Sequence, residues 1–142
     1  MSKPFLKQIE KISTPEGILM PLYKDWEKWH NGYDIKMSYI TTLNPGTKKG
    51  PILHNKRKGM MFCISGSVTV ECFFENKIHK FKLGNNNCNS LVIPAGIPNM
   101  IINNSINQTA IVLNMPDHAW HPDDEDTIKF DSWDSLSRGS NE

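Results

Sequence analysis

His54 lies within a run of basic residues, positions 48–58, that contains five positive side chains and no acidic one. An imidazole changes charge near neutral pH, so it is the usual general base for taking a proton from carbon. The positive side chains either form a solvated surface or bind an anionic ligand; they are Lys48, Lys49, Lys56, Arg57 and Lys58. A base among cations makes this run the first candidate site.

Three of the four other histidines have to be weighed against His54. His79 lies among lysines in an alternating segment, which predicts an exposed side chain. His118 and His121 flank Trp120 near the start of an acidic stretch, residues 117–142, which holds eight acidic and two basic residues. These two imidazoles either reach the candidate site or interact with the acidic stretch, which is otherwise solvated surface.

The elements that position these side chains are predicted to be strands. Apolar and polar residues alternate with period two through the middle of the chain, and turn residues separate the alternating segments. Seven short strands without a helical segment among them predict an all-β sandwich or barrel; they cover residues 35–41, 60–64, 67–74, 77–83, 90–93, 99–103 and 109–114.

The two ends of the chain differ from this middle. Trp26 and Trp29 lie in a segment that forms either a short helical turn or a separate strand arm. The acidic stretch keeps enough apolar residues to pack back on the body as a short helix or strand: Ile128, Phe130 and Trp133. We predict one domain over residues 1–142, with its core at about 35–116 and short extensions at both ends.

Composition excludes several classes of protein. The chain has 142 residues and a net charge of +1, with 38% hydrophobic and 22% charged residues. A disordered chain would be less hydrophobic, and a protein that coats nucleic acid would be more basic. Three cysteines without CxxC spacing, no apolar leader and no membrane-length apolar stretch predict a reduced, cytoplasmic protein that contacts neither nucleic acid nor membrane; Cys63 and Cys72 are expected in the core.

Two short motifs resemble those of the cupin family, whose fold is a jelly-roll barrel. The first covers residues 46–66, in which His54 matches the second histidine of a pair and Ser65-Gly66 matches the closing turn. The second covers 94–103, where Pro94, Gly96 and Asn103 are correctly spaced. The resemblance therefore implies an all-β cupin jelly-roll (double-stranded β-helix) barrel.

The departures from these motifs concern the metal ligands. Ile52 stands at the first histidine position, Asn99 at the last one, and residues 55–65 contain no glutamate. Divalent metals in such a cage need several imidazole and carboxylate ligands. We therefore expect no metal and no other cofactor. An unusual metal site formed by His54 with His118 or His121 is a further alternative.

Within the cupins, the sequence is similar to metal-free enzymes that act on nucleotide-linked keto-sugars. Tyr39-Ile40, Lys49-Gly50 with His54, and residues 63–67 match the 3,4-ketoisomerases of dTDP-4-keto-6-deoxyglucose. The late run from Pro122 to Asp131 resembles the corresponding 3,5-epimerases. This resemblance spans about residues 35–133. It implies an epimerase or ketoisomerase of nucleotide-linked 4-keto-6-deoxy-sugars, in surface polysaccharide or deoxysugar biosynthesis.

The same resemblance implies roles for individual residues. His54 would be the catalytic base, and Tyr39 the catalytic acid that stabilises the enolate. The substrate-binding residues would be Lys49, Lys56, Arg57, Asn99 and Trp120, with Lys49 or Asn99 polarising the ketone and the cations binding pyrophosphate. The nucleotide base would stack on an aromatic ring of Trp26, Trp29 or Tyr33. Trp120 stands near the place of the epimerases' acidic tyrosine and cannot donate a proton from oxygen.

Two further expectations complete the sequence-based hypothesis. The incomplete ligand set also fits a non-catalytic cupin that has lost its metal site and only binds a small molecule. Small cupins of this kind are usually dimers, because their exposed strand edges need covering. We expect a homodimer, with the segment of Trp26 and Trp29 as the candidate contact.

Overall fold

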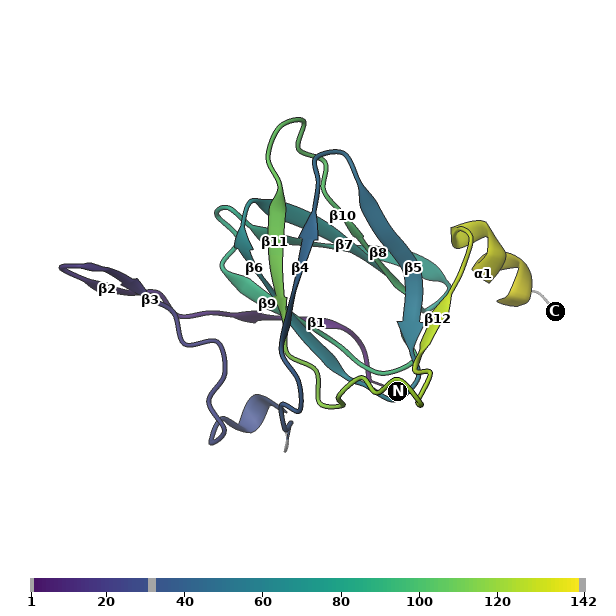
Figure 1. Cartoon of the computed structure of the whole chain (residues 1–142), viewed down its shortest axis with the longest axis horizontal. Helices are drawn as coiled ribbons and strands as arrows, with labels where there is room; N and C mark the ends of the chain where they lie inside the picture. The colour runs from purple at the N-terminus through teal and green to yellow at the C-terminus, as the bar shows by residue number, and fades with distance from the viewer. Residues whose placement is uncertain (1, 31–32, 141–142) are drawn as a thin grey trace.

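The structure, a computed structural model, describes residues 2–30 and 33–140, so Glu142 of the acidic stretch lies outside it. Two five-stranded antiparallel sheets face each other (Figure 1). Sheet I contains, in spatial order, β1 (Phe5–Gln8), β9 (Asn89–Ile93), β6 (Gly59–Ser65), β11 (Ala110–Asn114) and β4 (Tyr39–Leu43). Sheet II contains β12 (Thr127–Lys129), β5 (Lys48–His54), β10 (Asn99–Ile102), β7 (Ser67–Phe74) and β8 (Lys77–Gly84).

Alternating side chains fill the space between the two sheets. Along β7, Val68, Val70 and Cys72 point inward and are at most 3% exposed, whereas Thr69 and Glu71 are half-buried on the other face. Inward-facing residues of both sheets form one apolar cluster, to which Cys63 and Cys72 contribute as the sequence predicts: Leu43, Met61, Cys63, Val68, Val70, Cys72, Leu83, Leu91, Ile93, Ile97, Ala110 and Val112. Burial of this cluster holds the sheets together.

Of the two structures expected for the segment of Trp26 and Trp29, the helical turn forms at Trp29, whereas a strand arm lies earlier in the chain, at residues 12–19. β1 extends sheet I, and the hairpin of β2 (Ile12–Thr14) and β3 (Gly17–Leu19) projects from the body as an arm (Figure 1). A single 3₁₀ turn, η1 (Lys28–His30), follows. Side chains of this region pack on the outer face of sheet I: Leu22, Tyr23, Trp29, Tyr33 and Ile35. Tyr33 is 4% exposed, and its hydroxyl lies within hydrogen-bond distance of the carbonyls of Lys58 and Met115.

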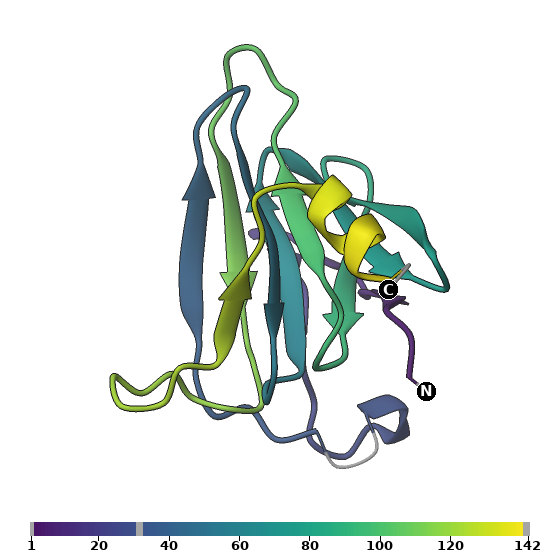
Figure 2. The ribbon, with the colours of Figure 1, turned by 90° about the vertical axis from the view of Figure 1, so that its right-hand side faces the viewer.

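The C-terminal region also forms both a strand and a helix. β12 pairs antiparallel with β5, so that Thr127 lies opposite His54. α1 (Trp133–Ser140) lies outside sheet II (Figure 2). Trp133 stacks on Phe73 at a centroid distance of 6.2 Å and donates from Nε1 to Glu71 at 2.9 Å. The acidic stretch is therefore anchored on the barrel at several points.

The strand boundaries differ from the prediction at two places. The strand predicted from residue 35 begins at Tyr39, because residues 35–38 belong to the segment that covers sheet I. β5 extends through Gly50 and Pro51, residues that normally interrupt strands. Gly50 has φ +118°, and a Cβ there would lie 2.6 Å from the carbonyl oxygen of Asn99. Its missing side chain lets β5 lie close beside β10.

Candidate active site

One end of the barrel holds a cavity with an empty volume of about 400 Å³, part of it open to solvent. Strands of both sheets begin or end around it, and residues 115–126 cross this end between β11 and β12 (Figure 1). Eleven described residues line it: Tyr39, His54, Arg57, Gly59, Met61, Ile93, Pro94, Ile97, Asn99, Asn114 and Pro116. The predicted residues His54, Tyr39, Arg57 and Asn99 are thereby brought together.

His54 is the last residue of β5 and is held from two sides. Its carbonyl accepts a hydrogen bond from the amide of Gly96 at 2.7 Å. Its Nδ1 lies 3.1 Å from Oγ1 of Thr127, the residue opposite it on β12. Burial, together with the nearby Arg57 cation, lowers the pKa of His54 to about 4 although Asp126 opposes the shift. The imidazole is therefore neutral at pH 7 and can accept a proton.

Arg57 forms a buried ion pair at the inner end of the cavity. The guanidinium is 6% exposed, and its Nε donates to Oδ2 of Asp126 at 2.7 Å. Asp126, 1% exposed, also accepts a hydrogen bond on Oδ1 from the amide of Lys56 at 2.6 Å. Burial alone would raise the pKa of Asp126, but the contacts with Arg57 and the Lys56 amide hold it below its usual value. The pair is thus charged at neutral pH.

Tyr39 begins β4 on sheet I, opposite the strand that carries His54. Burial raises the pKa of its phenol, and the adjacent Arg57, which hydrogen-bonds to it, partly offsets that rise. The phenol therefore keeps its proton at neutral pH and can donate it. His54, Tyr39 and Arg57 together provide a neutral base, a protonated acid and a cation around one cavity.

Two asparagines contribute the remaining polar side chains of the cavity lining. Asn99 begins β10, is 6% exposed and donates from Nδ2 to the carbonyl of Ile97 at 3.2 Å. Asn114 ends β11, is 8% exposed and donates to the carbonyl of Val112 at 3.5 Å. The rest of the wall is largely apolar, with Met61, Ile93 and Ile97. Such a surface suits an uncharged ligand with an apolar group.

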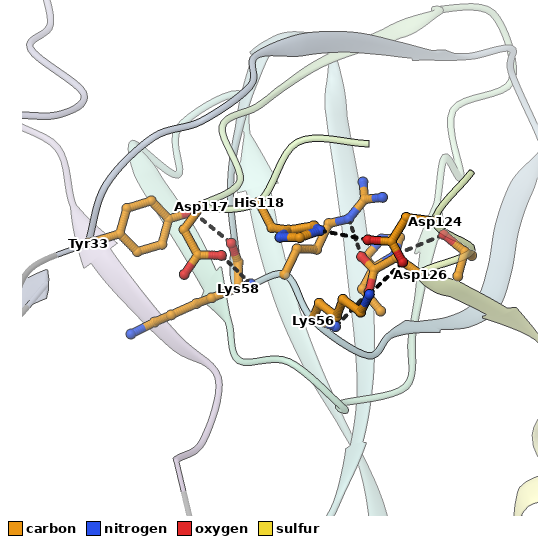
Figure 3. Close-up of polar contacts among 10 residues, drawn as sticks. Tyr33, Lys56, Lys58, Asp117, His118, Asp124 and Asp126 are labelled. Atoms are coloured by element: carbon orange, nitrogen blue, oxygen red, sulfur yellow. Dashed lines mark hydrogen bonds and ion pairs between the residues drawn. The ribbon is translucent and has the colours of Figure 1, made fainter. Parts of the chain in front are cut away.

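The other predicted binding residues lie outside this cavity. Lys49 is exposed and lines a separate surface hollow with Pro51 and Phe130. Trp120 is 58% exposed in the crossing segment. Lys56 is exposed and its ammonium pairs with Asp124 (Figure 3). None of these three side chains is among the described residues that line the cavity, and all three are exposed.

The three aromatic side chains that were expected to stack on the nucleotide base are not among the residues that line the cavity. Trp26 is 73% exposed, whereas Trp29 and Tyr33 belong to the apolar cluster on the outer face of sheet I. The Tyr33 hydroxyl is used to hold Lys58 and Met115 in place (Figure 3). The Lys58 amide donates to the Asp117 carboxylate at 2.8 Å, and the Lys58 carbonyl accepts from the Asp117 amide at 3.0 Å. Tyr33 thus positions the chain beneath the cavity.

The three other histidines weighed from the sequence, His79, His118 and His121, contact residues close to them in the chain. Nε2 of His118 is 3.3 Å from the Asp124 carboxylate (Figure 3). Nδ1 of His121 accepts a hydrogen bond from the Asp123 amide at 3.2 Å. His79, expected to be exposed, instead is half-buried and stacks on Phe74 at 3.7 Å. Among residues 2–30 and 33–140, no group of three or more His, Cys, Asp or Glu side chains could hold a metal ion.

Sequence reasoning missed three residues of this site: Asn114, Asp126 and Thr127. Asn114 follows Ala110 and Val112 on the inward face of β11, so a polar residue in an apolar alternation could have identified it. Asp126 and Thr127 lie in the acidic stretch, which was interpreted as a charged surface. No local pattern separates Asp126 from the neighbouring acids, because its burial depends on Arg57, 69 residues away.

Comparison with known proteins places the chain in a family. The family described as FdtA, WxcM-like C-terminal, matches residues 2–134. The chain belongs to the WxcM-like C-terminal family. Because this match covers nearly the whole sequence, the resemblance inferred from the motifs is confirmed at the level of the family. No sequence among the curated proteins matches the chain.

Solved structures share the fold of this WxcM-like protein at low sequence identity. The 3,4-ketoisomerase QdtA from Thermoanaerobacterium thermosaccharolyticum, in complex with TDP-4-keto-6-deoxyglucose, has a TM-score of 0.75 and 18% identity and covers 99% of this chain and 96% of that one. A 3,4-ketoisomerase from Helicobacter canadensis has a TM-score of 0.75, 16% identity and 98% coverage of both chains. The predicted all-β cupin jelly-roll is thereby confirmed.

An epimerase has the same fold but is longer. NovW, a 4-keto-6-deoxy sugar epimerase from the novobiocin biosynthetic gene cluster of Streptomyces spheroides, has a TM-score of 0.75 and 12% identity. The match covers 89% of this chain and 68% of NovW.

In the part of the chain that the structure describes, no helix is long and apolar enough to span a membrane.

Proposed function

We propose that this protein is an isomerase of nucleotide-linked 4-keto-6-deoxy-sugars that moves a proton between carbons next to the ketone. The observation that carries the proposal is the pairing of a neutral His54 with a protonated Tyr39 in one cavity. Family membership and the fold shared with TDP-sugar ketoisomerases and epimerases support the same chemistry.

The reaction follows from these two groups. His54 takes the proton from the carbon beside the ketone, the C–H electron pair forms a C=C bond, and the carbonyl electron pair moves to oxygen. Tyr39 donates its proton to that oxygen and accepts one from the neighbouring hydroxyl, which gives the enediol in its alternative form. His54 then returns the proton to the former ketone carbon, so that ketone and hydroxyl have exchanged places.

We favour ketoisomerisation over epimerisation for two reasons. The chain is covered almost completely by the ketoisomerases and covers only 68% of NovW. Epimerisation needs an acid on the opposite face of the sugar, and the residue in the expected region, Trp120, has no acidic proton and is exposed. The apolar wall formed by Met61, Ile93 and Ile97 suits the methyl group of a 6-deoxy sugar.

The test uses TDP-4-keto-6-deoxyglucose in deuterated water, followed by NMR and mass spectrometry. With the unaltered protein, we expect a 3-keto product that carries deuterium at C4, the former ketone carbon. His54→Asn should lower turnover by about 10²–10⁴-fold, because it removes the base. Binding of the sugar nucleotide without turnover or deuterium uptake would contradict the proposal and favour the non-catalytic alternative.

We also propose a single cupin domain that forms a homodimer in the cytoplasm. Residues 10–20 of the projecting arm are all exposed, and Ile18 and Leu19 there are 60% and 56% exposed. Apolar side chains on an arm suit contact with a second copy. Three free thiols suit a reducing compartment. Light scattering of the full chain and of Ile18→Lys tests the dimer, which the charged variant should weaken.

A further inference from the structure

Arg57 lines the cavity beside His54 and Tyr39 and does not lie on the exposed surface, where a pyrophosphate ligand would be expected. Of the eleven described residues that line the cavity, Arg57 alone carries a charge at neutral pH. It is 6% exposed and shares the cavity with the neutral His54 and the protonated Tyr39. A cation that is withdrawn from water and faces a proton-transfer site interacts strongly with negative charge that develops there.

Asp126 determines how Arg57 presents its donors. The ion pair uses Nε of the guanidinium, at 2.7 Å from Oδ2 of Asp126, and a guanidinium has four further N–H donors on its terminal nitrogens. Asp126 itself is not part of the cavity lining and is fixed by the Lys56 amide. The carboxylate therefore holds the guanidinium from behind, while Arg57 reaches the cavity and the Tyr39 hydroxyl.

We propose that Arg57 is a catalytic residue that binds the ketone oxygen of the substrate and stabilises the enolate, and that Asp126 is its positioning residue. This inference rests on the proposed function and deepens it, because it assigns Arg57 to the sugar rather than to the diphosphate. When His54 removes the carbon-bound proton, the electron pair that leaves the carbonyl bond comes to rest on the oxygen held by Arg57. Lys49 and Lys56, which are exposed in the same basic run, remain available for the diphosphate in place of Arg57.

The test measures binding of TDP and of TDP-4-keto-6-deoxyglucose by calorimetry, together with kcat and KM, on the full chain. Arg57→Gln should keep the affinity for TDP within about twofold, lose the additional affinity for the keto-sugar nucleotide, and lower kcat by about 10²–10³-fold. Lys77→Gln, which removes an exposed charge from β8, serves as the matched control and should change neither quantity.

A second variant addresses the stability of the buried pair. Removing one partner leaves an unpaired buried charge, whereas Arg57→Met with Asp126→Leu replaces the pair by apolar groups and tends to preserve folding. This double variant should reproduce the loss of sugar-dependent affinity and of kcat. Asp126→Asn, which keeps the guanidinium but loosens it, should lower kcat about tenfold while TDP affinity and KM stay within about twofold.

Several outcomes would overturn the assignment of Arg57. A tenfold or greater loss of TDP affinity in Arg57→Gln would make it a diphosphate ligand. Unchanged kcat and unchanged preference for the keto-sugar nucleotide in either Arg57 variant would make it a structural residue only. If the unaltered protein binds the keto-sugar nucleotide without turning it over, the proposed function fails, but the binding preference still decides whether Arg57 contacts the sugar.

Discussion

Two neighbouring residues of the basic run form ion pairs with two residues of the acidic stretch that are two positions apart, and the pairs differ sharply in burial. Lys56 pairs with Asp124 at the surface, where the side chains are 52% and 33% exposed. Arg57 pairs with Asp126 in the interior, at 6% and 1%. Water screens the outer pair, so it contributes little to stability, whereas breaking a buried pair such as the inner one costs about 3–5 kcal/mol. Both pairs join a cation to a carboxylate, so they differ in burial and not in charge.

The comparison extends to the chemistry of the two regions. The inner pair lies beside a histidine whose pKa is lowered to about 4 and a tyrosine whose pKa is raised. In the outer region, Asp124 contacts Lys56 and His118, and these contacts lower the pKa of its carboxyl. Burial shifts the pKa values of His54 and Tyr39 in the direction that favours their neutral forms, whereas the contacts of the outer region stabilise charges that water would also stabilise. Perturbed groups in a cavity are typical of catalysis.

The largest expected effect comes from breaking the inner pair. Asp126→Ala should destabilise the fold by about 3–5 kcal/mol, because it leaves the Arg57 guanidinium buried without a partner. Urea unfolding followed by circular dichroism measures this loss. If Asp126→Ala lost less than about 1 kcal/mol, the inner pair would behave like the outer one, and the contrast between them would fail.

The second prediction concerns the pH dependence of stability. The pKa of His54 is about 4 in the folded protein and near 6.5 when unfolded, so the unfolded chain binds more protons between these values. Stability contributed by the neutral imidazole is present above pH 6.5 and is lost as pH falls toward 4. The melting temperature of the unaltered protein should therefore fall more steeply across this range than that of His54→Asn. Equal slopes would argue against a buried, neutral His54.

A third, smaller effect is expected from Thr127. Thr127→Val keeps the shape of the side chain but removes the hydroxyl 3.1 Å from Nδ1 of His54. We expect kcat to fall about fivefold to tenfold, corresponding to the roughly 1 kcal/mol of one hydrogen bond. Thr127→Ser keeps the hydroxyl and should restore most of the rate; failure of this rescue would show that packing, and not the hydrogen bond, is important.

The smallest effect is predicted for the outer pair. Lys56→Gln and Asp124→Asn should each leave the free energy of unfolding nearly unchanged, and added salt should reduce any difference further. Denaturation at low and high ionic strength measures it. A salt-independent loss of several kcal/mol would mean that the outer pair is shielded from water like the inner one.

The sequence allowed most of the barrel to be predicted because alternation is a local property. Six of the predicted strands correspond closely to β6, β7, β8, β9, β10 and β11, and the inward residues of β7 follow the predicted period. The strand at Tyr39 was predicted to begin four residues too early. Residues 35–38 do alternate, but they precede the strand, and Ile35 packs on the outer face of sheet I instead.

The candidate site was predictable only in part. His54, Tyr39 and Asn99 were selected from short motifs, and the structure places all three around one cavity, although their roles remain predictions. Lys49 and Trp120 share residue types that bind nucleotides but lie outside the cavity. Asp126 and Thr127 were missed, since their partners Arg57 and His54 are about 70 residues away along the chain.

The sequence by itself determined the fold class, the main strands and the motif residues of one family, because each depends on residue types at short spacing. The tertiary structure alone decided which member of the run from Lys56 to Lys58 is buried and which acid neutralises it. Burial and pairing are set where β12 returns beside β5 and brings Asp126 to Arg57. The free energy of a charge depends on that three-dimensional environment, and no local pattern encodes it.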